Sequence, residues 1–486
     1  MTKNLFITKI LNNQFQKKNK LFLGRSCISN ITNYSEIGDY ECIDYHWNDN
    51  SKFNQDYKYL YDLYYKIIEA ISRDLNQFHK LNKSKTFWFS IVGSWIYKFL
   101  ISSFDKWETT KLAFNNYDIS NVYNYDQTTP NLIPSDITDF NQLIENEVWN
   151  NCLTTEIIKF KKIKNINFIN MKCEKNLNKN FKLNMHQAQA TTLPKYIDRL
   201  VSFLQKKPNV VLYKTYFGKI RNLKLFLKFE SIPRIFTEFD ESNDLPFPIE
   251  RRGMNLSMKT FNEFENFLTS KIFEFIPVSY LEGFNEINKI QKKINIHPSL
   301  IISAMGETND LFTIWAANQR EKKTVYFYSE HGGILEDLGQ FDSRTIKYDC
   351  FLSWNHSSKK NSFQISPHIY SKKININLIK NSKKLYVILT SSNKHTVFIN
   401  SGLKTVQSLE SYEKLKFLKK FPAKIKKNIK FRPHPTSNFW SIEERIRNDF
   451  GSEYICNEKK IENAFSQSKI ILDTDFQTTF YEGMST

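Results

Sequence analysis

The sequence predicts an α/β protein built on parallel sheets, and two stretches of the chain carry that prediction. Between residues 300 and 328, two short apolar runs flank an amphipathic segment, which is the pattern of a strand, a helix and a second strand. From residue 385 onward the same alternation repeats several times. Because consecutive parallel strands need a crossover that is usually a helix, this alternation favours a doubly wound parallel sheet. The expected strands cover 300–303, 324–328, 385–389, 429–432, 453–456 and 470–472, and the expected helices cover 311–320, 406–421, 441–450, 461–467 and 478 onward.

The chain has 486 residues, of which 41% are hydrophobic, enough for two or three domains with a large core. Nearer the N-terminus we expect strands at 21–24 and 209–213 and helices at 57–78, 88–107, 196–205 and 261–275. Residues 109–182 are rich in Asn and weakly patterned, so we expect a loop-rich insertion there. We place an N-terminal domain at 1–375 and a C-terminal domain at 376–486. The last helix begins shortly before Thr486, so we expect the C-terminal domain to be truncated.

Residues 87–104 form an apolar segment of about the length of a membrane span. Lys98 lies well inside the segment and serines interrupt it. A charge deep in a span costs about 3 kcal/mol on insertion scales. We therefore favour a buried helix over a membrane span.

The formal net charge of +19 favours an anionic partner, such as a nucleotide-linked substrate, a nucleic acid or an acidic membrane surface. A lysine-rich solvated surface would explain much of the same excess. The sequence has no RRM, KH, zinc-finger or clear helix-turn-helix signature, so nucleic-acid binding is not favoured. Six scattered cysteines without a CxxC pair support neither a zinc site nor a disulfide framework, and they fit a reducing cytosol.

Three polar loops are expected to follow strands, at the position where parallel sheets bind ligands. The first is Ser329-Glu330-His331-Gly332-Gly333. Paired glycines let the backbone approach a ligand closely, and a neutral His331 is suited to take a proton from a hydroxyl at about neutral pH. The alternative is a glycine turn beside an incidental surface histidine.

The second loop is Phe431-Arg432-Pro433-His434-Pro435. The guanidinium of Arg432 offers a planar fork that suits phosphate oxygens. The two prolines fix the backbone, so Arg432 and His434 are held at low entropic cost. The alternative is a proline-rich strand exit with a structural role only.

The third loop carries Asp475, Thr478, Thr479 and Glu482, where a strand ends and a helix begins. Backbone N–H groups at a helix start attract phosphate, and Glu482 lies one turn further, in position to accept from a ribose hydroxyl. The alternative is helix capping, which explains Thr478 and Asp475 without a ligand.

Other candidates are weaker. His46, Glu307 and Asp475 are expected near a substrate cleft, although a packed aromatic cluster is the alternative for His46. HExxH, Walker A and GxGxxG motifs are absent from the sequence, so we expect neither a metal nor a cofactor. Four more histidines have no pattern of partners that would mark a site: His186, His297, His356 and His395.

With these loops, most of the chain resembles a group of transferases encoded in bacterial O-antigen and surface-carbohydrate gene clusters. A more distant likeness is to CDP-glycerol glycerophosphotransferases and bacterial sialyltransferases of GT-B-like fold, which carry His-Gly, Arg-Pro-His-Pro and Thr-Asp-aromatic loops. The likeness is carried by Leu21-Phe22-Leu23-Gly24, Asp44-Tyr45-His46-Trp47, Tyr57-Lys58-Tyr59-Leu60, Trp88, Gly93, Trp95, Ile276-Pro277, Tyr280-Leu281-Glu282-Gly283, Glu330-His331-Gly332-Gly333, Arg432-Pro433-His434-Pro435 and Thr478-Thr479-Phe480-Tyr481-Glu482.

The resemblance implies two Rossmann-like domains of GT-B-like type that face a cleft, with the nucleotide donor on the second and the acceptor on the first. It implies a metal-independent glycosyltransferase, in which His331 and His434 are catalytic. Donor contacts would come from Gly332, Gly333, Arg432, Thr478, Thr479 and Glu482. The residues after Gly333, Ile334-Leu335-Glu336-Asp337, are bulkier and more acidic than is usual in the family.

We therefore expect a cytoplasmic enzyme that moves a sugar or related group from a nucleotide-activated donor to a surface polysaccharide. If the acceptor is linked to a lipid, we expect the enzyme to contact the inner membrane peripherally. The alternative is a catalytically degenerate protein of the same pathway that binds nucleotide or glycan.

Overall fold

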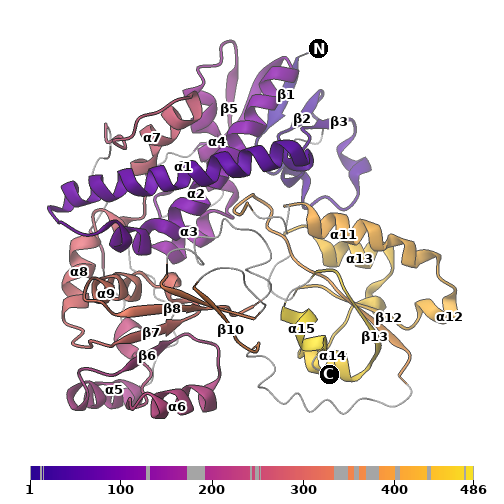
Figure 1. The fold of residues 1–486 in the computed structure, drawn as a ribbon. Helices are drawn as coiled ribbons and strands as arrows, with labels where there is room; N and C mark the ends of the chain where they lie inside the picture. The colour runs from indigo at the N-terminus through magenta and orange to yellow at the C-terminus, as the bar shows by residue number, and fades with distance from the viewer. Residues whose placement is uncertain are drawn as a thin grey trace.

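The computed structural model describes residues 2–10, 14, 16–126, 132–171, 192–240, 244–246, 251, 253–332, 348–354, 361–367, 382–399, 405–434, 439–475 and 478–484. These residues form three parallel β-sheets surrounded by helices, which confirms the predicted α/β class (Figure 1). The first two sheets fall within residues 1–375 and the third within 376–486. The residues named above that lie outside the described ranges are His186, Gly333, Ile334, Leu335, Glu336, Asp337, His356, Pro435 and Thr486.

The first sheet has the strand order β3-β2-β1-β4-β5, and every neighbouring pair is parallel. The chain winds outward from β1 to β3 and then crosses to β4 on the other side of β1, so the order reverses between β1 and β4. Doubly wound sheets bind ligands beyond the carboxyl ends of their strands. The strands are β1 (Lys3–Phe6), β2 (Lys20–Phe22), β3 (Tyr40–Cys42), β4 (Ile119–Tyr125) and β5 (Asn167–Met171).

The expectation of a loop-rich insertion at 109–182 is wrong for the described part of that range. It contains β4, β5 and the helices α3 (Ile137–Leu143) and α4 (Glu147–Phe160). Four of the asparagines that weakened the apolar pattern belong to the sheet itself: Asn121, Asn124, Asn167 and Asn170. Asn121 Nδ2 on β4 donates to Asn4 Oδ1 on β1 at 2.9 Å. At this position two polar side chains on adjacent strands therefore pair with each other.

Two long helices, α1 (Asn50–His79) and α2 (Lys85–Asn116), lie between the first and second sheets (Figure 1). They confirm the helices expected at 57–78 and 88–107 and extend them. Capping fixes their starts, because the side chain of Asp49 accepts from two backbone N–H groups of α1 and that of Ser84 accepts from Phe87 N. α2 has the length and composition of a membrane span, but 89% of its most apolar window is buried inside the protein. Lys98 and Lys106 both lie on this helix.

The second sheet has the order β10-β9-β8-β7-β6, again all parallel. The predicted strand–helix–strand unit is confirmed as β7 (Leu300–Ser303), α9 (Asp310–Glu321) and β8 (Val325–Ser329). The remaining strands are β6 (Val210–Tyr213), β9 (Cys350–Ser353) and β10 (Ser362–Gln364), and the helices are α5 (Thr192–Leu204), α6 (Lys219–Lys228), α7 (Glu263–Phe275) and α8 (Phe284–Lys292).

The third sheet has the order β12-β11-β13, so its winding reverses between β11 (Lys384–Ile388) and β13 (Ser468–Asp473). Alternate residues of β11 face opposite sides. Val387 packs toward α11 (Gln407–Leu415) and α13 (Ile442–Asp449), whereas Tyr386 packs toward α14 (Ile461–Ser466). The predicted doubly wound arrangement is therefore present here. The other elements are β12 (Ile429–Arg432), α12 (Ala423–Lys426) and α15 (Thr478–Met484).

Two details of the third sheet differ from expectation. The strand expected at 453–456 is absent from this described segment, which holds a 3-10 turn and a single bridge from Ile455 to Phe431. The helix expected at 406–421 ends at Leu415 and continues as a 3-10 turn at Lys416–Lys420. Both departures are local, because Phe431 and Ile455 still pack in one apolar cluster.

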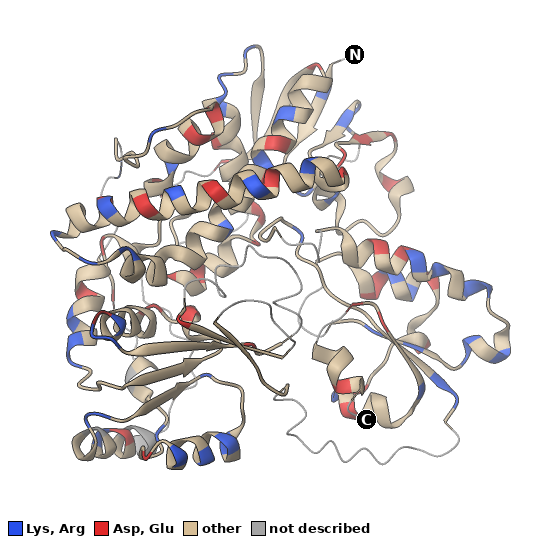
Figure 2. Cartoon of the chain, viewed as in Figure 1, with Lys and Arg blue, Asp and Glu red and all other residues tan. Residues whose placement is uncertain are grey.

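Basic residues are distributed over helices around all three sheets, and acidic residues alternate with them on α1 and α13 (Figure 2). The net charge of +19 is thus carried by many surface segments. The helices α5 and α6 at the lower edge of the second sheet are an exception, since basic residues predominate there (Figure 2).

Candidate active site

A cavity of about 200 Å³ lies beyond the carboxyl ends of β1, β2 and β3. Its wall on the sheet side includes the turn after β2, from Leu23 to Cys27, and α2 contributes Asp105 and Lys106. The segment after β11 closes the opposite side with Lys394 and His395. The first and third sheets therefore both contribute to what we call the first-sheet cavity.

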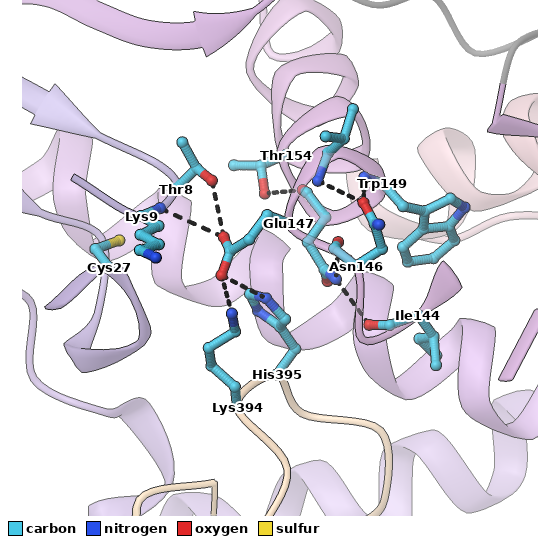
Figure 3. Close-up of polar contacts among 12 residues, drawn as sticks. Thr8, Lys9, Cys27, Ile144, Asn146, Glu147, Trp149, Thr154, Lys394 and His395 are labelled. Atoms are coloured by element: carbon cyan, nitrogen blue, oxygen red, sulfur yellow. Dashed lines mark hydrogen bonds and ion pairs between the residues drawn. The ribbon is translucent and has the colours of Figure 1, made fainter. Parts of the chain in front are cut away.

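Glu147 contacts residues on both sides of this cavity, the loop after β1 and the segment after β11 (Figure 3). Its carboxylate accepts from Thr8 Oγ1 at 2.8 Å and from Lys9 N at 3.4 Å, both in the loop after β1. The same carboxylate pairs with the ammonium group of Lys394 and lies 3.8 Å from His395 Nε2. Asn146 caps α4, so the Glu147 side chain in the first turn is not needed for capping.

The surroundings of Glu145 and Glu147, two neighbouring carboxyl groups, shift their pKa values in opposite directions. Burial alone would raise the pKa of Glu147, but His395 and Lys394 hold that pKa well below its usual range. Burial raises the pKa of Glu145 to about 7. The positive charges of Lys98, Lys394 and Lys106 oppose this rise, and the negative charge of Glu147 adds to it. Burial also lowers the pKa of His395. The pKa values of these two neighbouring carboxyl groups are therefore shifted in opposite directions.

His46 does not line the first-sheet cavity directly. Its side chain is fully buried among Tyr45, Trp47 and Phe104, which is the aromatic cluster named above as the alternative. His46 Nε2 lies 3.1 Å from Asp105 Oδ1, and Asp105 does line the cavity. Burial would raise the pKa of Asp105, but the bond to His46 and the charge of Lys106 lower it overall. His46 is therefore a positioning residue for Asp105.

Among the residues that the structure describes, Lys106 is a buried ammonium group without an ion pair. The residue is 5% exposed, and among the described residues its Nζ has one hydrogen bond, to Ser102 Oγ at 3.1 Å, and no carboxylate within 4.0 Å. Burial lowers the pKa of Lys106 against the pull of Asp105 and other carboxylates. A buried cation without a partner costs stability, so its retention beside a cavity points to a ligand contact.

We expect Lys106→Met to raise the free energy of unfolding by about 1 kcal/mol or to leave it unchanged, because removing a buried unpaired charge is neutral or stabilising. Urea denaturation of the variant and the wild type measures the difference. Lys98→Met is the matched comparison on the same helix, since Lys98 Nζ donates to Asn141 Oδ1 at 2.7 Å. A loss of more than about 2 kcal/mol in Lys106→Met would show that Lys106 is structurally required.

A second cavity, of about 260 Å³, contains His331 and Glu307, and we call it the His331 cavity. Lys98 and Asn141 line its α2 side, and Phe398 reaches it from the segment after β11. Glu307 Oε1 accepts from Tyr328 at 3.1 Å, while its buried Oε2 has no partner among the described residues. The structure thus brings together two residues predicted separately from the sequence, a histidine and a carboxylate, with a lysine at the same cavity.

Neighbouring groups hold the His331 loop in place. Glu330 is completely buried and accepts from Trp354 N at 2.7 Å and Ser353 Oγ at 3.3 Å, which joins the ends of β8 and β9. The ring of Tyr216, from the loop after β6, stacks on His331 with 5.4 Å between centroids. The loop that carries His331 is therefore held by contacts to the segments after β6 and β9.

The His331 loop also meets the third sheet. A Cβ atom added to Gly332 would lie 2.7 Å from Thr478 Oγ1 at the start of α15. Further along the same edge, Thr390 N donates to Thr474 Oγ1 at 3.0 Å, which links the ends of β11 and β13. The carboxyl edges of the second and third sheets therefore face each other.

The other predicted residues on the third sheet have defined surroundings. Arg432 donates to the backbone carbonyls of Glu458 and Lys459, so its fork is held by protein groups. His434 is exposed beside a small pocket that Thr390 also lines, and partial burial lowers its pKa.

At the start of α15 the hydroxyl of Thr479 donates to Asp473 at 3.0 Å. Burial raises the pKa of that aspartate. Asp475 N lies 3.3 Å from the same carboxylate, and Glu482 is half-buried one turn further along.

The sequence did not identify Asp105, Lys106, Glu147, Lys394 or His395 as residues of a site. Glu147 and Lys394 are 247 residues apart, so no local spacing relates them. The available signal was the row of charged residues inside an apolar helix, since Lys98, Asp105 and Lys106 all point to cavities there. Within the described ranges, no three His, Cys, Asp or Glu side chains lie close enough to hold a metal ion.

Polar groups thus gather beyond the carboxyl ends of parallel strands, which is where α/β proteins bind their ligands. A family model described as LIC12162 family transferase matches residues 4–486, and the chain belongs to that family. Comparison with curated proteins and with solved structures gave no match.

Proposed function

We propose that the protein moves a sugar, or a related group, from a nucleotide-activated donor to a hydroxyl of a surface polysaccharide or of its lipid-linked precursor. Membership of a transferase family supports group transfer. The likeness of the His331, Arg432 and Thr478 loops to those of nucleotide-dependent transferases supports the donor class. The observation that carries the proposal is the approach of Gly332 to Thr478, which sets two carboxyl edges against each other beside His331.

In this proposal the donor lies along the third sheet, with its phosphates toward Thr478 and its sugar toward the His331 cavity. The acceptor oxygen bonds to the transferred carbon as the bond from that carbon to the phosphate oxygen breaks. The nucleotide leaves with the electron pair of the broken bond, and His331 takes the proton of the acceptor hydroxyl. Lys98, which lines the His331 cavity, supplies fixed positive charge near the leaving phosphate, and such a charge lowers the barrier most when it is already in place.

The test is to incubate the full chain with UDP-, GDP-, CDP- and dTDP-linked sugars and to measure donor binding and nucleotide release. We expect at least one donor to raise the melting temperature and to be turned over, faster with a glycan acceptor present. Binding without release would favour the alternative of a degenerate binding protein. Absence of binding to every nucleotide-linked sugar would contradict the donor class.

A further inference from the structure

Helices α5 and α6 carry an exposed apolar surface beside the second sheet. Of the twenty large apolar side chains exposed among the described residues, eleven lie between residues 196 and 235. Phe203 and Ile220 are the most exposed of all, at 77% and 73%. Such a concentration is unusual on a soluble surface and marks an interaction site. The eleven are Tyr196, Ile197, Leu200, Phe203, Leu204, Tyr216, Ile220, Leu223, Leu227, Ile232 and Ile235.

Each of the two helices packs against the rest of the protein through only a few buried residues. On α5, the buried Asp198 accepts from Ile235 N at 3.0 Å and from Thr237 N at 2.7 Å, which docks the helix on the segment after α6. On α6, Phe226 is the one buried residue. Gln205, at the end of α5, donates to Glu230 O at 3.1 Å, which joins the exits of both helices. Val201 and Phe226 are buried and Leu225 is half-buried against the core, and the other described apolar side chains of the two helices are exposed.

The same surface is strongly basic. Residues 196–235 contain nine Lys and Arg and two Asp and Glu, so their formal charge is 9 − 2 = +7. One of the two acidic residues, Asp198, is buried. Figure 2 shows basic residues along both helices. The exposed basic residues are Arg199, Lys206, Lys207, Lys219, Lys224 and Lys228.

We propose that this α5–α6 face docks on an anionic lipid bilayer, with both helices lying in the membrane interface. Exposed apolar side chains interleaved with Lys and Arg are the composition that partitions into a negatively charged interface. A second copy of the chain fits less well, since two faces of +7 would repel each other. A nucleic acid would match the charge but would leave the eleven apolar side chains in water.

The position of this face adds a functional consequence. α6 begins three residues after Tyr216, whose ring is 52% exposed and stacks on His331. A membrane bound to the α5–α6 face therefore lies next to the His331 cavity, where a lipid-linked acceptor would have to arrive. The docking itself stands on the surface alone and does not depend on the proposed donor chemistry.

The test measures flotation of the full chain with vesicles of phosphatidylglycerol and phosphatidylethanolamine, and with vesicles of phosphatidylcholine alone. We expect binding to the anionic vesicles, weakened by high salt. Leu200→Ser with Phe203→Ser, and separately Lys224→Glu with Lys228→Glu, should each weaken binding by at least about tenfold. Donor turnover in the absence of lipid should be unchanged in both variants.

The matched control is Lys424→Glu with Ile425→Ser on α12, where both residues are exposed and which lies beside the third sheet. This variant should bind vesicles like the wild type. Equal losses in the control and the α5–α6 variants would overturn the proposal, as would equal binding to both vesicle types or to neither. Self-association that disappears in Leu200→Ser with Phe203→Ser, without vesicle binding by the wild type, would assign the face to a second copy instead.

Discussion

Replacing Glu147 with alanine is expected to lower the free energy of unfolding by about 2–4 kcal/mol. The change removes the acceptor for Thr8 and Lys9 and leaves the largely buried Lys394 without its counter-ion. Breaking one partner of a buried pair costs more than the pair itself contributes, because the other charge stays in the protein. Urea denaturation monitored by tryptophan fluorescence measures the effect.

Glu443→Gln is the control, because Glu443 pairs with Arg447 on the surface of α13 with side chains 42% and 48% exposed. Its loss should be at most about 0.5 kcal/mol. The pH dependence gives a second check through Glu147→Gln. The folded-state pKa of Glu147 lies below the unfolded value of about 4.3, so its contribution is complete above that value and is lost as the pH falls toward the folded-state pKa. A difference between wild type and Glu147→Gln that stays constant down to acidic pH would contradict this assignment.

Substituting His331 with asparagine is expected to lower the rate of transfer by about 10²- to 10⁴-fold while donor affinity changes little. Asparagine keeps a polar side chain in the His331 cavity but cannot take a proton from the acceptor. Steady-state kinetics with a turned-over donor should therefore show the loss in kcat rather than in the KM for the donor.

His297→Asn serves as the comparison, since His297 lies before β7 at the opposite end of the second sheet and pairs with Gln319 at 3.2 Å. It should leave transfer unchanged within about twofold. Equal rates in wild type and His331→Asn would remove His331 from the proposed mechanism.

Much of the fold was predictable where apolar periodicity was strong. The long helices α1 and α2, the β7–α9–β8 unit and most of the third sheet follow from the spacing of their apolar residues. β1 and β4 were not predicted, because their polar residues pair across strands instead of facing water, as Asn4 and Asn121 do. Patterns read from one strand cannot reveal a partner on another.

Some residues of the candidate site could likewise be predicted from the sequence, and others could not. His331 and Glu307 could be predicted because each follows a strand within a local motif, and the sheet then brings them to one cavity. His395 could not, because its partner Glu147 is set by the meeting of the first and third sheets. Long-range electrostatic pairs of this kind depend on the assembled fold, so a single sequence carries no spacing that reveals them.

The donor is proposed to lie along the third sheet, between Thr478 and the His331 cavity. Photolabelling the full chain with an azido derivative of a nucleotide-linked sugar that it binds, followed by peptide mapping, tests this most directly. We predict labelled peptides that contain residues 329–332 or 473–484. Label confined to the first-sheet cavity, on peptides around Leu23 to Cys27 or Asp105 to Thr109, would contradict the account.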